Sequence, residues 1–148
     1  MMKAILIGIL GVIVAHMVYA QQPAQLGAEL GATMDLHKHP LLFTRLSYSA
    51  PIRSMRIDGG AIALFGRDGG FGFDVLATRP IGAFEPLAGA RFLVWERSMS
   101  VGFPLGARWK FIEGAVELTL GLSVAPTLHL AAEERNTGIF DTFIGVRF

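Results

Sequence analysis

The sequence predicts an all-β protein, an eight-stranded antiparallel up-and-down transmembrane β-barrel that follows a cleavable signal peptide. Three observations lead to this fold class. The chain ends in an alternating segment whose last residue is aromatic, its mean hydropathy is +0.49 although only the N-terminus contains a long apolar run, and the remainder divides into about eight short alternating segments. A strand of about ten residues crosses a bilayer with apolar side chains on one face, so a barrel is hydrophobic without long apolar runs.

Residues 1–20 are predicted to be the signal peptide. Lys3 supplies a positive charge, an apolar run follows it, and the small residue Ala20 precedes a polar segment. We expect cleavage after Ala20, which leaves residues 21–148 as one barrel domain. A retained helical anchor is the alternative interpretation, although the segment would barely span a bilayer and contains His16.

Charge and cysteine content exclude several classes of protein. The whole chain has 13 Lys and Arg residues against 12 Asp and Glu residues, and removal of Lys3 with the signal peptide leaves 12 of each. A chain with zero net charge has no basic field to attract nucleic acid, so no nucleic-acid partner is expected. The absence of cysteine excludes a thiol-linked lipid anchor and a disulfide framework. No second run of about 18 apolar residues follows the signal peptide, which excludes helical spanning.

The first predicted strand, residues 26–35, has the clearest alternation in the N-terminal half. Leu26, Leu30 and Met34 fall on one face and Glu29 falls on the other. The next three strands are predicted, from the same period of two, at residues 41–49, 55–65 and 71–78.

The second half of the chain contains four more alternating segments. The fifth strand is predicted at residues 87–97, with Phe92 and Val94 toward lipid and with Arg91 and Trp95 toward the lumen. The last three strands are predicted at residues 103–111, 116–125 and 138–148. We expect the final strand to pair with the first one and so to close the barrel.

Short gaps rich in Pro, Gly, Asp and Ser separate the segments and predict a meander of hairpins. Inner turns are predicted at residues 50–54, 79–86 and 113–114. Outer loops are predicted at residues 36–40, 66–70, 98–102 and 126–137. Only the loop at 126–137 is long enough to carry a surface of its own, so it is the candidate contact for a partner. Eight strands match the smallest barrels, whose interior is filled by side chains, and no open pore is expected.

Together these features resemble the small eight-stranded outer-membrane barrels of the OmpA and OmpX type, a match of architecture over the mature chain. More locally, residues 101–111, 117–126 and 145–148 resemble a group of short bacterial barrel proteins that carry no assigned activity. The resemblance implies the outer membrane of a Gram-negative-type bacterium, with outer-membrane lipid and the barrel-assembly machinery as partners. It also implies a C-terminal insertion signal made of Ile144, Val146 and Phe148. The usual signal has glycine where this chain has Phe143.

Inward-facing charges are the only group of side chains that suggests chemistry. Five acids and five bases are predicted to form a lumen charge network: Glu29, Arg45, Asp58, Asp74, Arg91, Arg108, Lys110, Glu117, Asp141 and Arg147. One interpretation is a polar ligand site or a proton or ion path, because ionisable groups at membrane depth often mark one. The interpretation that we favour is a plug, because the signs balance and charges in a narrow lumen must pair.

No catalytic, cofactor or metal site is predicted. Some eight-stranded outer-membrane barrels deacylate lipid A with a histidine and a serine two residues apart, a spacing that lets the imidazole take the serine proton. Here His129 is followed by Leu130 and Ala131. His37 and His39 could supply two metal ligands, but a site needs a third and none is evident.

The sequence therefore predicts an outer-membrane barrel with a structural or surface-interaction role and no catalysis. One alternative is a soluble periplasmic barrel that holds a lipid among inward-facing apolar side chains. That alternative requires charged residues on the outside, in water: Glu29, Arg91, Arg108 and Glu117. A lipid-A-modifying hydrolase is the third hypothesis.

Overall fold

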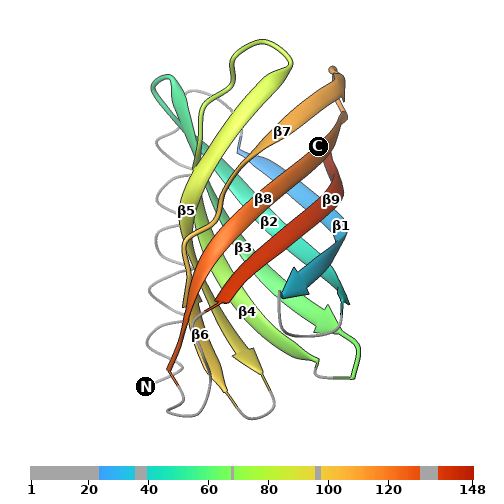
Figure 1. The fold of residues 1–148 in the computed structure, drawn as a ribbon. Coiled ribbons are helices and arrows are strands. Elements are labelled where there is room, and N and C mark those ends of the chain that lie inside the picture. The colour runs from blue at the N-terminus through green and yellow to red at the C-terminus, as the bar shows by residue number, and fades with distance from the viewer. Residues whose placement is uncertain (1–23, 36–39, 68, 96–97, 131–136) are drawn as a thin grey trace, which may run out of the picture.

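The computed structural model describes residues 24–35, 40–67, 69–95, 98–130 and 137–148, which form a closed antiparallel β-barrel (Figure 1). Within these ranges no helix is long and apolar enough to cross a membrane. The strands have the following bounds: β1 Gln25–Asp35, β2 Leu41–Ile52, β3 Met55–Phe65, β4 Gly70–Thr78, β5 Phe84–Trp95, β6 Met99–Gly102, β7 Leu105–Ile112, β8 Glu117–His129 and β9 Thr137–Arg147.

The barrel closes by pairing of its first and last strands, as the sequence predicts. β1 and β9 pair in a continuous antiparallel register from Gly27 opposite Arg147 to Asp35 opposite Ile139. Beyond the end of this ladder, Leu26 and the terminal Phe148 exchange two backbone hydrogen bonds of 3.0 Å each. Closure therefore leaves no free sheet edge, which a membrane-spanning sheet cannot tolerate in lipid.

β6 and β7 are two parts of one barrel strand, because the register of β6 against β5 and against β8 continues into β7. The interruption falls at Phe103 and Pro104. Gly89 donates a backbone hydrogen bond of 3.0 Å to the Pro104 carbonyl, and Phe103 donates one of 3.0 Å to the Pro126 carbonyl. Neither proline has an N–H group to return the bond. The barrel thus has eight strands, the number predicted from the sequence.

The two ends of the barrel differ in their connections. The turn end, uppermost in Figure 1, carries the connections at residues 53–54, 79–83 and 113–116. The loop end, lowermost in Figure 1, carries the connections that follow β1, β3, β5 and β8.

Several predicted connections were too long. The predicted loop at 98–102 is wrong because β6 occupies residues 99–102, and the predicted loop at 126–137 begins too early because β8 continues to His129. The predicted turns at 50–54 and 79–86 also lose residues to β2 and β5.

Prolines explain most of these errors. Pro51, Pro86 and Pro126 each lie within a strand and keep its register. The Pro86 carbonyl, for example, accepts a hydrogen bond of 3.2 Å from the Arg79 N–H. A proline removes one donor from a ladder but leaves its own carbonyl as an acceptor, so the strand continues past it.

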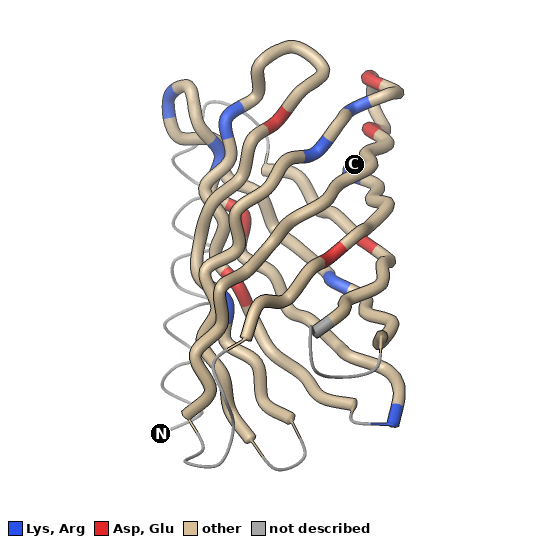
Figure 2. Tube along the Cα trace, in the orientation of Figure 1, with Lys and Arg blue, Asp and Glu red and all other residues tan. Residues whose placement is uncertain are grey.

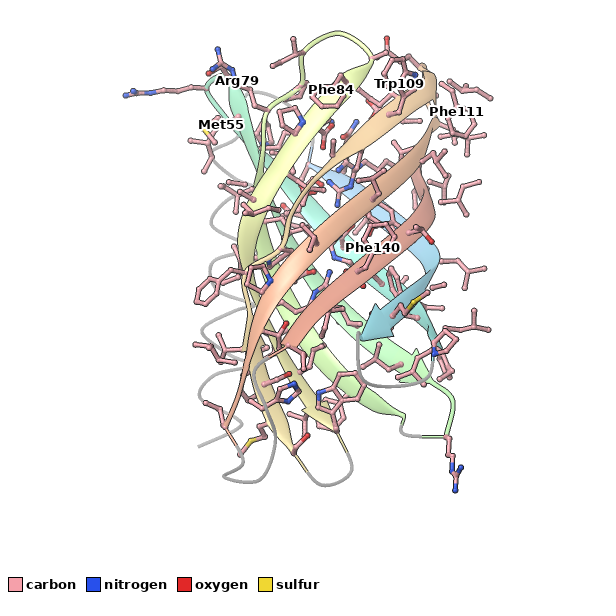
Figure 3. The ribbon with its side chains drawn as sticks, in the orientation of Figure 1. Met55, Arg79, Phe84, Trp109, Phe111 and Phe140 are labelled. Carbon is pink, nitrogen blue, oxygen red and sulfur yellow. The ribbon has the colours of Figure 1, made fainter. Side chains whose placement is uncertain are left out.

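The outer face of the barrel is apolar. Outward-facing strand residues include many exposed leucine, isoleucine, valine and phenylalanine side chains, and none of the described ones is charged. Figure 3 shows Phe84, Trp109 and Phe111 near the turn end and Phe140 farther down the outer face. The rings of Phe84 and Trp109 meet edge to face with centroids 6.4 Å apart. An apolar band with aromatic residues near its end is the outer surface of a membrane barrel.

Candidate functional site in the barrel lumen

The lumen contains every charged strand residue whose side chain the structure describes. Six are acids and six are bases, so the formal charges balance. They are Glu29, Arg45, Arg56, Asp58, Asp74, Glu85, Arg91, Arg108, Lys110, Glu117, Asp141 and Arg147. Among the described residues, Figure 2 shows the charged ones mainly in the upper and middle parts of the barrel, with few in the lower part.

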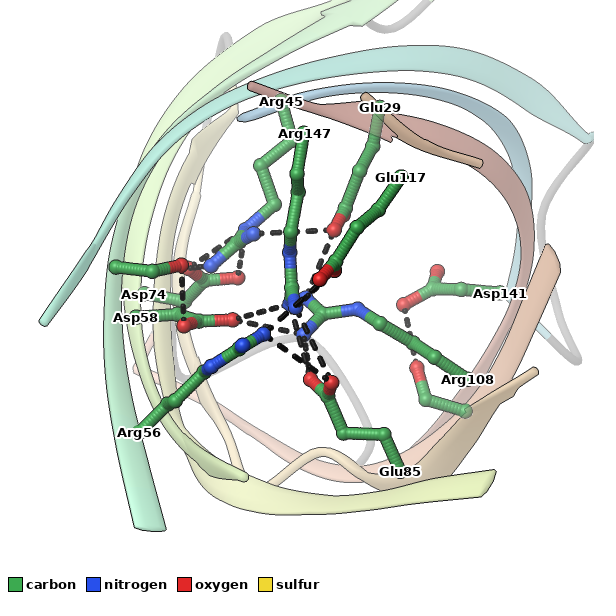
Figure 4. A network of polar contacts seen from close by, with 12 residues as sticks. Glu29, Arg45, Arg56, Asp58, Asp74, Glu85, Arg108, Glu117, Asp141 and Arg147 are labelled. Carbon is green, nitrogen blue, oxygen red and sulfur yellow. Dashed lines mark hydrogen bonds and ion pairs between the residues drawn. The ribbon is translucent and has the colours of Figure 1, made fainter. Parts of the chain in front are cut away.

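Arg108 on β7 is the hub of this network and is fully buried. Its Nη1 donates hydrogen bonds to Asp58 at 2.7 Å and to Glu85 at 3.2 Å, and its Nη2 donates to Glu29 at 2.8 Å. Figure 4 shows the guanidinium groups in the middle of the lumen with carboxylates around them. One arginine thus joins acids from β1, β3 and β5, because the planar guanidinium has donors that point in several directions.

Arg45 on β2 forms the second centre. It holds Asp74 on β4 in a two-pronged contact, with Nε at 2.9 Å and Nη2 at 2.7 Å from the same carboxylate, and its Nη1 lies 3.3 Å from Glu29. Gly60 on the intervening strand makes room for this pair. A Cβ added at Gly60 would lie 2.4 Å from Arg45 Nε and 2.7 Å from Asp74 Oδ1. The glycine is therefore part of the site.

The network opens toward the turn end. Arg147 Nη2 binds Asp58 at 2.9 Å and Glu85 at 3.0 Å, and its Nη1 lies 3.9 Å from Glu117. Arg56 lies 3.8 Å from Glu85 and 3.6 Å from Glu117, with its side chain 21% exposed. Because its side chain is partly exposed, Arg56 is the point at which the network meets solvent at the turn end.

The other limit of the network lies near the middle of the barrel. Arg91 on β5 forms an ion pair with Asp141 on β9 and approaches Asp74 at 3.6 Å. Ser123 on β8 donates a hydrogen bond of 3.2 Å to the same Asp141 carboxylate. Beyond this level, toward the loop end, none of the described inward side chains is charged.

The sequence placed ten of these charges in the lumen, and the structure places all ten there. Nine contact one another directly or through a shared partner. Lys110 differs, because its Nζ pairs with Glu113 in the β7–β8 turn at 3.1 Å, and Glu113 is 61% exposed. Lys110 therefore lies at the rim, outside the connected network.

Sequence reasoning missed Arg56 and Glu85. Glu85 falls within the predicted turn at 79–86, yet it is fully buried and binds two arginines. The signal was present as a period of two, because Glu85 has the same parity as Arg91 on β5, and Arg56 has the same parity as Asp58 on β3.

The loop-end half of the lumen is mainly apolar. Its inward side chains form one buried hydrophobic cluster with members from most strands, among them Leu41, Leu64, Leu93, Trp95, Ala125 and Ile139. The indole N–H of Trp95 donates a hydrogen bond of 3.2 Å to the fully buried Ser100 hydroxyl. The inward position predicted for Trp95 is confirmed.

Phe43 and Phe143 lie at the boundary between the two halves. Their rings meet edge to face with centroids 6.4 Å apart, and Arg108 Cζ lies 5.7 Å from the Phe143 centroid. A Cβ added at Gly121 would lie 2.2 Å from the Phe143 ring. Phe143, which occupies the place of the glycine in the usual terminal signal, therefore fills the lumen over a glycine of the neighbouring strand.

The predicted terminal signal and His129 lie outside the charge network. The side chains of Ile144, Val146 and Phe148 lie on the outer face, with Phe148 59% exposed. His129 ends β8, where its Nε2 lies 3.2 Å from the Thr137 hydroxyl. The described ranges contain no group of three or more metal-ligating side chains, and His37 and His39 lie outside those ranges.

The arrangement contradicts the inside-out alternative. A soluble lipid-holding barrel requires Glu29, Arg91, Arg108 and Glu117 in water, and all four are buried in the lumen. Exposed leucine and phenylalanine side chains cover the outside instead. The apolar and charged faces are therefore arranged as in a membrane barrel.

Comparison of the sequence with protein-family models and with curated proteins finds no match. Comparison of the structure does find matches. The N-terminal β-barrel domain of Pseudomonas aeruginosa OprF is similar over 84% of this chain and 97% of that one, with a TM-score of 0.54 and 11% identity. The fold is that of the small outer-membrane barrels of the OmpA and OmpX type.

Two further solved structures are similar at a lower level. Neisserial surface protein A matches over 84% of this chain and 94% of its own, with a TM-score of 0.49 and 15% identity. The outer membrane enzyme PagL matches over 84% and 98%, with a TM-score of 0.45 and 14% identity. At such identities the likeness concerns the fold alone.

Proposed function

We propose that this chain is a structural barrel of the outer membrane of a Gram-negative-type bacterium, with a lumen that is plugged by its own side chains. The separation of charge carries the proposal. Twelve charged strand residues face inward, and the described outward-facing strand residues carry none. A charge on the lipid face of a barrel is strongly unfavourable at mid-membrane depth, whereas charges in the lumen can pair.

The plug follows from how the lumen is filled. In the turn-end half each acid of the network lies beside a base, and in the loop-end half apolar side chains pack against one another. An ion that entered from the turn end would meet paired charges and then an apolar region with no charged partner among the described side chains. Transport through the lumen and catalysis in it are therefore not part of the proposed role.

Export and assembly belong to the same proposal. Residues 1–20 would direct secretion and be removed, and the outward-facing Ile144, Val146 and Phe148 would be read by the barrel-assembly machinery. Outer-membrane lipid would then cover the apolar face. A partner at residues 126–137 stays a prediction, and β8 already includes the first four of these residues.

The test is fractionation of cells that express the full chain, with heat-modifiable gel mobility as the readout. The proposal predicts recovery in the outer membrane, a mobility shift that depends on boiling, and loss of both when Phe148 is deleted. Purified protein in planar bilayers should give no stable conductance. Recovery in the soluble periplasmic fraction would contradict the membrane location, and discrete open channels would contradict the plugged lumen.

A further inference from the structure

Two arginines at the turn end have no acidic partner among the residues that the structure describes. Arg53 and Arg79 are exposed, and neither forms an ion pair with any residue that the structure describes. Arg53 lies in the β2–β3 turn, and Arg79 directly follows Thr78, which pairs with Arg56 next to that turn. Two strand spacings of about 4.8 Å separate the two turns, so the two positive charges belong to one side of the rim.

The other described basic side chains at the turn end are paired with acids. Arg56 turns inward to Glu85 and Glu117, and Lys110 is paired with Glu113 on the β7–β8 side. Among the described residues, the unpaired positive charge of the rim thus lies on the side formed by the β2–β3 and β4–β5 turns. Figure 3 shows Arg79 beside Met55 at this end of the barrel.

The backbone at Arg53 adopts a conformation that is unusual for a residue with a side chain. Its φ is 56°, the left-handed region, in which glycine is unstrained and a longer side chain is not. The two-residue turn between β2 and β3 would form more easily with glycine at this position.

Apolar side chains lie at the same level on the outer face. Ile81 in the β4–β5 turn is 57% exposed, and Ile52, Met55 and Phe84 at the strand ends next to these two turns are each more than two-fifths exposed. Two reciprocal backbone hydrogen bonds between Ile81 and Phe84, of 2.7 Å and 3.1 Å, hold this turn in shape. The two arginines therefore stand at the boundary between an apolar surface and water.

We propose that Arg53 and Arg79 bind the headgroup phosphate of an anionic phospholipid in the leaflet at the turn end. The guanidinium groups would contact the phosphate, and the apolar residues beneath them would contact the acyl chains. An arginine that contacts an anionic headgroup strengthens association about fivefold. This inference rests on the proposed membrane location.

The experiment uses the full barrel refolded into phosphatidylcholine vesicles that contain spin-labelled phosphatidylglycerol or, in a parallel sample, spin-labelled phosphatidylcholine. The amount of motionally restricted lipid gives the relative association of the two. We expect phosphatidylglycerol to be preferred over phosphatidylcholine, and the preference to fall about fivefold in Arg53→Gly and in Arg79→Gln. Arg67→Gln is the matched control, because Arg67 is an exposed arginine at the loop end.

Arg53→Gly removes the charge and also relieves the backbone, so this variant should fold at least as well as the parent chain. Its loss of lipid preference would then not be a folding defect. Equal association of the two lipids, or an equal loss in Arg67→Gln, would overturn the inference. Abolition of the preference by inorganic phosphate, at an ionic strength where chloride has no effect, would assign the site to free phosphate instead.

Failure of the inference and failure of the proposed function have different signatures. A barrel that shows heat-modifiable mobility in the vesicles but no lipid preference overturns only the inference. A chain that never shows that shift in vesicles contradicts the membrane location, and the inference with it.

Discussion

The two halves of the lumen are filled by side chains of opposite character, charged in one half and apolar in the other. At the turn end, inward side chains form a connected set of buried ion pairs around Arg108 and Arg45. At the loop end, inward side chains such as Leu93 and Ile139 form an apolar cluster that resembles the core of a soluble protein. The outer face is apolar along both halves, so the two halves differ in their inward side chains and not in their outer surface.

The two halves should lose stability for different reasons when a side chain is substituted. An apolar cluster loses packing in proportion to the side-chain volume removed. A charge network behaves otherwise, because removal of one member leaves its partners buried and uncompensated. We therefore expect the cost of a substitution to depend on its half of the lumen more than on its size. Four predictions, from the largest expected effect to the smallest, test this comparison.

Substitution of Arg108 by methionine should have the largest effect. It keeps much of the side-chain volume but leaves Glu29, Asp58 and Glu85 without their shared partner, and we expect a loss of about 4–5 kcal/mol in the free energy of unfolding. Equilibrium urea unfolding of the inserted barrel, followed by tryptophan fluorescence, measures it. Lys110→Met is the control, because Lys110 pairs only at the exposed rim and should cost less than about 1 kcal/mol. Equal losses in the two variants would contradict the hub role.

At the boundary between the halves, Phe143→Ala should cost about 3 kcal/mol, because it removes the ring that packs against Phe43 and covers Gly121. A double-mutant cycle with Gly121→Ala gives a sharper measurement. Gly121→Ala alone should be destabilising because its Cβ would overlap the ring, and it should cost much less when the ring is absent. Additive losses would show that the ring does not occupy this space.

Gly60→Ala should cost about 2 kcal/mol, because the added Cβ would displace the Arg45–Asp74 pair. Gly59→Ala is a closely matched control. The two glycines are adjacent on β3, but Gly59 faces outward and an added Cβ there meets nothing within 4 Å. The control should stay within about 0.5 kcal/mol of the parent in the same unfolding measurement. A larger loss in Gly59→Ala than in Gly60→Ala would show that the Arg45–Asp74 pair does not lie beside Gly60.

The smallest effect is expected for Ile139→Val in the apolar half. Ile139 is 1% exposed, and the loss of one methylene group from a packed cluster should cost about 1 kcal/mol. The same unfolding curves give the value. A loss as large as that of Arg108→Met would mean that the two halves do not differ in the way proposed.

The sequence by itself determined the barrel, its eight strands and the direction of most side chains. These depend on a period of two, which is a local property of an extended chain and can be read without knowing any partner. The third strand was predicted with the bounds Met55–Phe65 that the structure has. All ten predicted lumen charges face inward for the same reason.

Only the tertiary structure decided where strands pass through prolines and which charges meet. Pro86 predicts a turn and so conceals Glu85, because the effect of a proline depends on whether its missing N–H had a partner across the sheet. Arg147 and Asp58 are 89 positions apart and lie on strands that do not pair, yet their side chains are 2.9 Å apart. Their meeting depends on closure of the barrel and the register of all its strands, which no local pattern contains.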